Sequence, residues 1–169
     1  MAKYAVVRTD DLAGTDVRSQ LVSVKYMGAN GTTPTAIENG NVLKIGALMS
    51  GEREIYVGGA VAANTKLEDV VLIASPEVMY DERKRNLDEF INEAGKTCRG
   101  YHFHKGDSFS VTAEALSGTG TPAVGNIVEL AAGTKLAFAA SATASTTQVG
   151  RIIAIETAGR YTYYVVKVD

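Results

Sequence analysis

Residues 149–168, near the C-terminal end, read VGRIIAIETAGRYTYYVVKV and give the clearest indication of the fold. Two runs rich in β-branched and aromatic residues flank a short connector that contains a glycine, and this pattern predicts a β-hairpin. Because side chains alternate along a strand, Ile153 and Ile155 fall on one face, and Ile152 and Ala154 on the other. Both faces are apolar, so we expect one to meet the domain core and the other a helix, a second sheet or another chain.

Short strands are also predicted along the rest of the chain. Continuous apolar content in Val70–Ala74 is typical of a strand that is covered on both faces. Alternating or β-branched patterns, separated by Gly-, Asn- and Thr-containing turns, indicate further strands at residues 4–8, 21–26, 41–49, 54–57, 100–104, 108–113, 126–130 and 135–139.

One short α-helix is predicted near residues 84–95, where four apolar side chains are spaced at i, i+3, i+4 and i+7: Leu87, Phe90, Ile91 and Ala94. Asn86 and Glu89 have the spacing of an N-terminal capping pair, and Gly95 stands where a C-terminal cap belongs. With many strands and no strand–helix alternation, we predict a mainly β protein, an antiparallel β-barrel or sandwich with one short α-helix.

The N-terminal segment is too polar after its first strand to form a core by itself. We interpret residues 1–18 as an extended arm and residues 19–169 as a single β-rich domain with the helical insertion. Two alternatives remain for the arm: a frayed terminus, or a strand that adds to the edge of a neighbouring sheet.

Composition restricts the classes of partner. A chain of 169 residues buries roughly 70% of its unfolded surface and needs neither disulfides nor a metal for stability. The formal net charge of −2 gives no basis for nucleic-acid or anionic-membrane binding. No apolar run reaches the length of a membrane span and no signal peptide is visible, so we expect synthesis in a cytoplasm-like compartment and no membrane partner.

Sequence patterns that would indicate a catalytic or cofactor-binding site are weak. Gly95-Lys96-Thr97 follows the predicted helix, so it cannot direct a helix N-terminus at a phosphate as a phosphate-binding loop does. The single cysteine, Cys98, is expected to be a small buried apolar residue rather than a nucleophile. We therefore expect no enzymatic activity and no cofactor.

Two histidines form the one candidate metal site. His102 and His104 are two residues apart in a predicted strand, so they share a face, and Asp107 follows closely. Two imidazoles and a carboxylate are suitable ligands for a transition metal. The alternative is a pair of half-exposed histidines near a turn.

The order of these features resembles the head-decoration, or cement, proteins of tailed bacteriophages. The resemblance rests on the polar N-terminal arm, on the predicted helix that ends at Gly95, and on three stretches: ENGNVLKIG at 38–46, RGYHFHKGDSFSVT at 99–112 and the strands that lead to the final VVKV. It implies a β-rich body, usually a homotrimer, on the outer capsid surface of the virion. It also implies that the protein bridges neighbouring major capsid subunits and so stabilises the capsid without catalysis.

Such a protein needs apolar surface for association. We therefore predict that the capsid or subunit interface uses residues of the first strand and of the terminal hairpin: Tyr4, Val6, Arg8, Tyr161, Tyr163 and Tyr164. Removal of residues 1–18 is expected to leave a folded protein that no longer binds empty capsids. The alternatives are another phage structural component, such as a head fibre base or a head–tail or tail protein, and a small β-barrel ligand-binding protein or enzyme.

Overall fold

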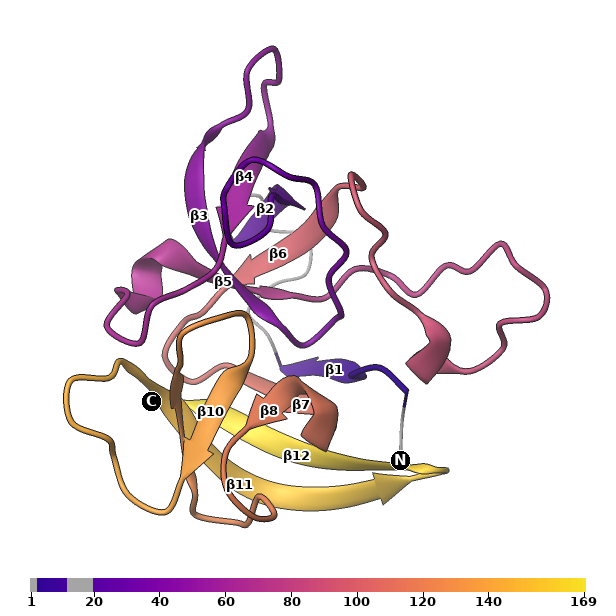
Figure 1. Cartoon of the computed structure of the whole chain (residues 1–169). Helices are drawn as coiled ribbons and strands as arrows, with labels where there is room; N and C mark the ends of the chain where they lie inside the picture. Colours follow the sequence, from indigo (N-terminus) through magenta and orange to yellow (C-terminus); the bar gives the residue numbers. More distant parts are fainter. Residues whose placement is uncertain (1–2, 12–19) are drawn as a thin grey trace.

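The computed structural model describes residues 3–11 and 20–169, which form a barrel and a sheet (Figure 1). The closed barrel has the strand order β2-β4-β3-β5-β6. Its strands are β2 (Leu21–Tyr26), β3 (Val42–Leu48), β4 (Ile55–Gly59), β5 (Val70–Ile73) and β6 (Cys98–His102). Most neighbours are antiparallel, whereas β2 and β4 run parallel.

The second unit is a seven-stranded open sheet with the order β1-β7-β12-β11-β9-β10-β8. Its strands are β1 (Val7–Asp11), β7 (Ser108–Val111), β8 (Leu116–Ser117), β9 (Ile127–Leu130), β10 (Leu136–Ala139), β11 (Gln148–Ala158) and β12 (Tyr161–Val168). The prediction of a mainly β protein with a barrel is therefore confirmed, and the barrel is accompanied by a separate sheet.

The barrel and the sheet share one hydrophobic core, which β5 illustrates. All four of its residues are fully buried, as predicted from its continuous apolar sequence. Val70 and Leu72 pack in the cluster that also contains sheet residues such as Phe109, whereas Val71 and Ile73 pack in a second cluster of barrel residues. The alternation of side chains thus directs one face of β5 to the sheet and the other to the barrel interior.

The terminal hairpin forms as predicted from its sequence, with β11 and β12 paired from Gly150–Val168 to Ala158–Tyr161. A two-residue turn joins the strands, and Gly159 has a φ of 61°, a conformation that glycine adopts without strain. The register shifts by one residue between Ile152 and Ala154, so Ile153 is the extra residue of a β-bulge.

The predicted α-helix near residues 84–95 is wrong. Only a single 3-10 turn, η2 (Leu87–Glu89), is present, and the chain is extended again at Phe90. The capping contact does form, because the Glu89 carboxylate accepts the Asn86 backbone N–H at 3.0 Å. Asn92 then pairs with Ile37 through two backbone hydrogen bonds. A helix of this length is marginal in water, so these long-range bonds outweigh the local preference.

Within the described residues, the N-terminal segment packs on the body of the protein and does not extend away from it as an arm. Ala5, Val6 and Val7 are buried, and the Val6 N–H donates to the Thr112 hydroxyl at 3.1 Å. Strand β1 pairs antiparallel with β7 of its own sheet. Residues 3–11 thus belong to the body of the protein because Ala5, Val6 and Val7 bury their side chains there and β1 pairs with β7, and the expected boundary at residue 18 lies outside the described residues.

Candidate functional site

The residues predicted to form an interface come together around the hairpin tip, but they do not share one surface. Three of them are buried by the chain itself and so are not available to a partner: Val6, Tyr163 and Tyr164. Tyr164 points into the shared core, where it belongs to the same cluster as Val111. The three that remain partly exposed are Tyr4, Arg8 and Tyr161.

Tyr163 is buried although it lies on the face of β12 opposite the shared core. The Arg8 guanidinium lies 4.5 Å from the centroid of its ring, a cation–π distance. Arg8 also donates a 2.6 Å hydrogen bond to the Glu156 carboxylate on β11. Strand β1 therefore supplies the side chain that covers Tyr163 on the second face of the hairpin, where the sequence predicts a helix, a second sheet or another chain.

Asp88, in the 3-10 turn η2, joins three segments that are distant in sequence. Its carboxylate accepts hydrogen bonds from the Tyr161 hydroxyl at 2.8 Å, the Arg160 guanidinium at 3.0 Å and the Lys3 backbone N–H at 3.1 Å. Burial acts to raise the pKa of Asp88, but these hydrogen bonds and the charge of Arg160 outweigh it and hold the pKa below its ordinary value. The hairpin tip is thus fixed to the N-terminal segment and to the connection after β5.

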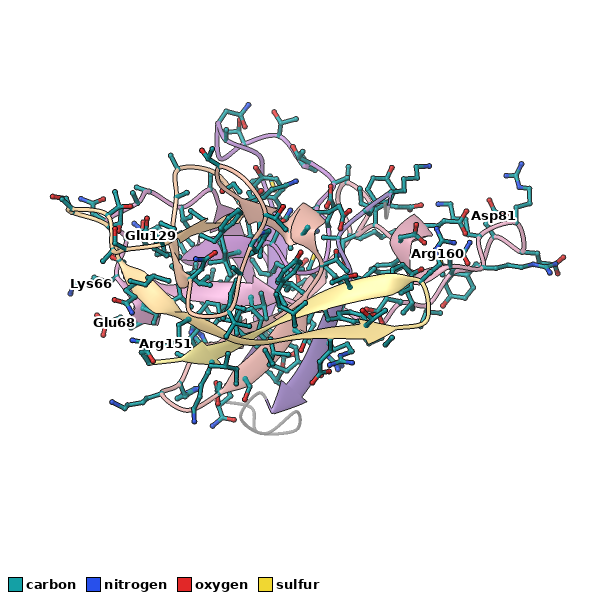
Figure 2. All side chains as sticks on the ribbon, turned by 90° about the horizontal axis from the view of Figure 1, so that it is seen from below. Lys66, Glu68, Asp81, Glu129, Arg151 and Arg160 are labelled. Carbon is teal, nitrogen blue, oxygen red and sulfur yellow. The ribbon has the colours of Figure 1, made fainter. Side chains whose placement is uncertain are left out.

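That connection, residues 74–97 between β5 and β6, projects from the body (Figure 1). Figure 2 shows Asp81 of the connection and Arg160 of the hairpin tip at one end of the molecule, with Glu129 and Arg151 at the other. Val78, Tyr80 and Leu87 are exposed apolar side chains on it, and Tyr80 is 94% exposed. Large exposed apolar side chains on a projecting segment are typical of a protein-binding element.

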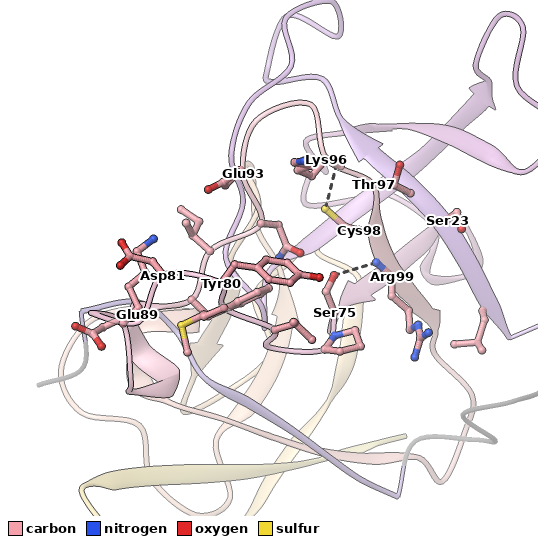
Figure 3. Close-up of a pocket in the computed structure, with 18 of the residues that line it drawn as sticks. Ser23, Ser75, Tyr80, Asp81, Glu89, Glu93, Lys96, Thr97, Cys98 and Arg99 are labelled. Carbon is pink, nitrogen blue, oxygen red and sulfur yellow. Dashed lines mark hydrogen bonds between the residues drawn. The ribbon is translucent and has the colours of Figure 1, made fainter.

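A groove of about 1000 Å³ lies between this connection and the barrel strands β2 and β6 (Figure 3). Its apolar lining includes Leu21 and Val22 of β2 and Phe90 and Ile91 of the connection. Charged residues of both signs surround it: Asp81, Lys84, Glu89, Glu93, Lys96 and Arg99. The groove cannot be recognised in the sequence, because Leu87, Phe90 and Ile91 have the spacing of an apolar helix face.

Cys98 also lines the groove, but its thiol is not activated as a nucleophile. Burial raises the pKa of Cys98 to about 11, so the thiolate is scarce at neutral pH. Its sulfur is 3.8 Å from the Lys96 carbonyl oxygen (Figure 3). Cys98 packs with Val24 and Leu43 in the barrel cluster, which matches the expectation of a small buried apolar residue.

The histidine pair does not assemble into a metal site with Asp107. Asp107 accepts the His104 backbone N–H at 2.9 Å, and its carboxylate is 3.8 Å from the His104 Nδ1 atom. Burial is the main reason why the pKa of His102 is lowered, and since a neutral imidazole is the form that binds a metal, this shift does not itself argue against a site. In residues 3–11 and 20–169, no three His, Cys, Asp or Glu side chains converge in a way that could hold a metal ion.

Two further exposed apolar side chains, Ile153 and Ile155, lie on β11, and each is 44% exposed. Val124 is close to them, because the N–H of the adjacent Gly125 donates to the Ile152 carbonyl at 2.8 Å. The described part of the chain therefore carries exposed apolar residues on the 74–97 connection and on the outer part of the hairpin, and Leu48 at the end of β3 is also exposed.

Comparison with known proteins adds no relative, since no protein-family model, curated protein or solved structure matches the chain. Among the described residues, none of the helical turns has the length or the apolar sequence that a membrane crossing requires.

Proposed function

We propose that this chain is a structural virion protein that binds the outer surface of a tailed-phage capsid. In this role it bridges neighbouring major capsid subunits and stabilises the shell without catalysis. The sequence resemblance to head-decoration proteins suggests this role, and it also implies a homotrimer. The observation that carries the proposal in the structure is the projecting 74–97 connection, which exposes Val78 and Tyr80 beside an apolar groove.

Exposed apolar area and an anchoring tyrosine would both contribute to binding at this connection. Tyrosine contributes a large apolar area and a hydroxyl with few rotatable bonds, and it is enriched among the residues that dominate binding energy. Complete burial of an exposed Val side chain contributes about 1.5–3 kcal/mol. The mixed charges around the groove, including Lys84 and Glu93, suit a polar rim around such an anchor.

Truncation of the N-terminal segment, which the sequence suggests as a test of the interface, is unsuitable for this structure. Removal of residues 1–18 would take β1 out of the sheet and expose the core around Val6, so loss of binding would not identify an interface. Surface substitutions avoid this difficulty. We suggest Val78→Ser combined with Tyr80→Ser. Val124→Ser is the control, because Val124 is about as exposed as Val78 but lies beside the hairpin.

The assay is co-sedimentation with shells of the phage that encodes the chain, prepared without this protein. The unsubstituted protein should bind the shells, and electron microscopy should place it on their outer surface. The Val78 and Tyr80 double variant should bind at least about tenfold more weakly, since loss of one anchor is worth more than 1.4 kcal/mol. Failure of the unsubstituted protein to bind, or its location in the tail or at the head–tail joint, would refute the proposal.

A further inference from the structure

The outer edge of β11 is open along its distal half. Strand β9 pairs with β11 only as far as Arg151. At the next residue, the Ile152 N–H donates to the Asn126 carbonyl at 2.9 Å, and the Ile152 carbonyl accepts from Gly125. From residue 153 to residue 158, neither a strand nor a loop of the described chain is bonded to this edge.

The register of the hairpin shows which backbone groups face outward. In an antiparallel ladder, successive residues direct their N–H and C=O groups alternately toward the partner strand and away from it. Ile152 points away from β12, and the bulge at Ile153 inserts one extra residue. At the other end, Ala158 and Tyr161 close a two-residue turn and so face each other. The backbone groups of Ile155 and Thr157 therefore point outward.

This edge carries few of the features that keep edge strands apart. Natural edges are commonly protected by lysine, proline or a covering segment. Residues 153–158 read IAIETA and contain neither lysine nor proline. The bulge at Ile153 and the charge of Glu156 are its protective features, and Ile155 on the open stretch is 44% exposed. Edge strands of this kind pair readily with a further extended strand.

We propose that two copies of the chain pair antiparallel along this edge, with Ile155 of one copy opposite Thr157 of the other. This register lets the outward backbone groups of both residues pair in both copies. It also matches the length of the open stretch, because it places the Gly159 turn of one copy opposite Ile153 of the other. There the open edge ends, since Ile152 is already bonded to Asn126.

The charges permit this contact. The two-fold axis passes between the two copies of Glu156, and like charges directly opposite each other would destabilise a pair of strands. Each Glu156 carboxylate is, however, already bonded to Arg8 of its own chain at 2.6 Å. Each copy therefore presents a neutral ion pair at the axis.

The contact does not depend on capsid binding, and its backbone hydrogen bonds come from β11 rather than from the 74–97 connection. A two-fold contact generates closed pairs. If the protein is a monomer otherwise, the pairing gives dimers; if it is the homotrimer that the resemblance implies, the pairing joins two trimers. In either case, loss of the contact halves the molecular mass.

The first test is the mass in solution, measured by sedimentation velocity and light scattering over roughly 1–500 µM without shells. Thr157→Pro removes one outward N–H that the contact between copies needs, so it should halve the mass. The variant should still fold, because proline is tolerated where a strand N–H faces solvent. Thr157→Ala keeps the N–H and should leave the mass unchanged. Ile155→Lys should also halve the mass, which provides a second variant should the proline impair folding. A mass that none of these changes alters would overturn the proposal.

The second test addresses the register. In the proposed pairing, the two Glu156 residues form a pair without mutual hydrogen bonds, with Cα atoms about 4.5 Å apart. That distance lies within the range of about 4.4–6.8 Å that a disulfide requires. Glu156→Cys should therefore link two chains when oxidised glutathione accepts the two electrons, whereas Thr162→Cys, exposed on β12, should not. Equal cross-linking of the two variants would refute the register.

Discussion

Replacement of Asp88 by asparagine tests whether one carboxylate holds the hairpin tip against the rest of the molecule. The side chain of Asp88 is 4% exposed and accepts hydrogen bonds from Tyr161, Arg160 and the Lys3 N–H. Asparagine keeps the shape of the side chain, but it removes the charge. It also converts one of the two acceptor oxygens into an NH2 donor, so the substitution tests charge and hydrogen bonding together while the packing is kept.

The expected cost follows from the difference between charged and neutral hydrogen bonds. A hydrogen bond to a charged group contributes about 1.5–3 kcal/mol and a neutral one about 0.5–1.5 kcal/mol, so each donor loses about 1 kcal/mol. Arg160 is 54% exposed and can turn to solvent, so its share is smaller. We expect Asp88→Asn to lower the free energy of unfolding by about 2 kcal/mol.

The assay is urea unfolding at pH 7. With a slope of about 2 kcal/mol per molar urea, the midpoint should fall by about 1 M. Asp81→Asn is the matched control, because Asp81 pairs with Arg83 at 2.9 Å in an exposed position of the same connection. Exposed pairs contribute little, so the midpoint of this control should stay close to that of the unsubstituted protein.

The pH dependence provides a second criterion. The pKa of Asp88 in the folded state lies below its value in the unfolded chain, so its ionised form stabilises the fold above the unfolded pKa. The stability difference between the unsubstituted protein and Asp88→Asn should be constant above about pH 5 and shrink as the pH falls below about 4. Equal midpoints for the Asp88 and Asp81 variants, or a difference that does not change down to low pH, would refute the reasoning.

Three further predictions concern the core, the thiol and one loop. A Cβ atom on Gly150 would meet the Lys167 carbonyl, so Gly150→Ala should destabilise the protein by about 1–3 kcal/mol in urea unfolding, whereas Gly59→Ala, with open space around it, should cost far less. The Cys98 thiol, with its pKa near 11, should react with a disulfide reagent at pH 8 only as fast as the protein unfolds; rapid reaction in the native state would contradict its burial. Glu129 accepts hydrogen bonds from the Thr143 N–H at 3.0 Å and the Thr146 hydroxyl at 2.8 Å, so Glu129→Gln should cost about 1–2 kcal/mol and speed amide hydrogen exchange at Thr143; unchanged exchange there would count against the contact.

Much of the strand content could be predicted from the sequence. The hairpin β11–β12 and the pair β9–β10 follow from patterns of side-chain type and from turn residues, which are local properties of the chain. The burial of Val70–Ile73 on both faces was also predictable from an unbroken apolar run. These elements need no information about distant partners.

The candidate site was much less predictable. Tyr163 looked available for a partner, but Arg8 covers its ring from another strand. The groove beside the 74–97 connection depends on how that connection packs on the barrel. No periodic pattern in the sequence predicts this packing. The exposure of Tyr80 is likewise a property of the folded chain.

Short strands and a terminal hairpin follow from the sequence alone, because alternation and turn chemistry act between neighbouring residues. The tertiary structure alone decided that residues 84–95 are not a helix, since the Ile37–Asn92 pairing competes with a weak local preference. It also decided that β1 joins the body and that the distal edge of β11 stays open. Each of these outcomes depends on hydrogen bonds and packing between residues far apart in the chain.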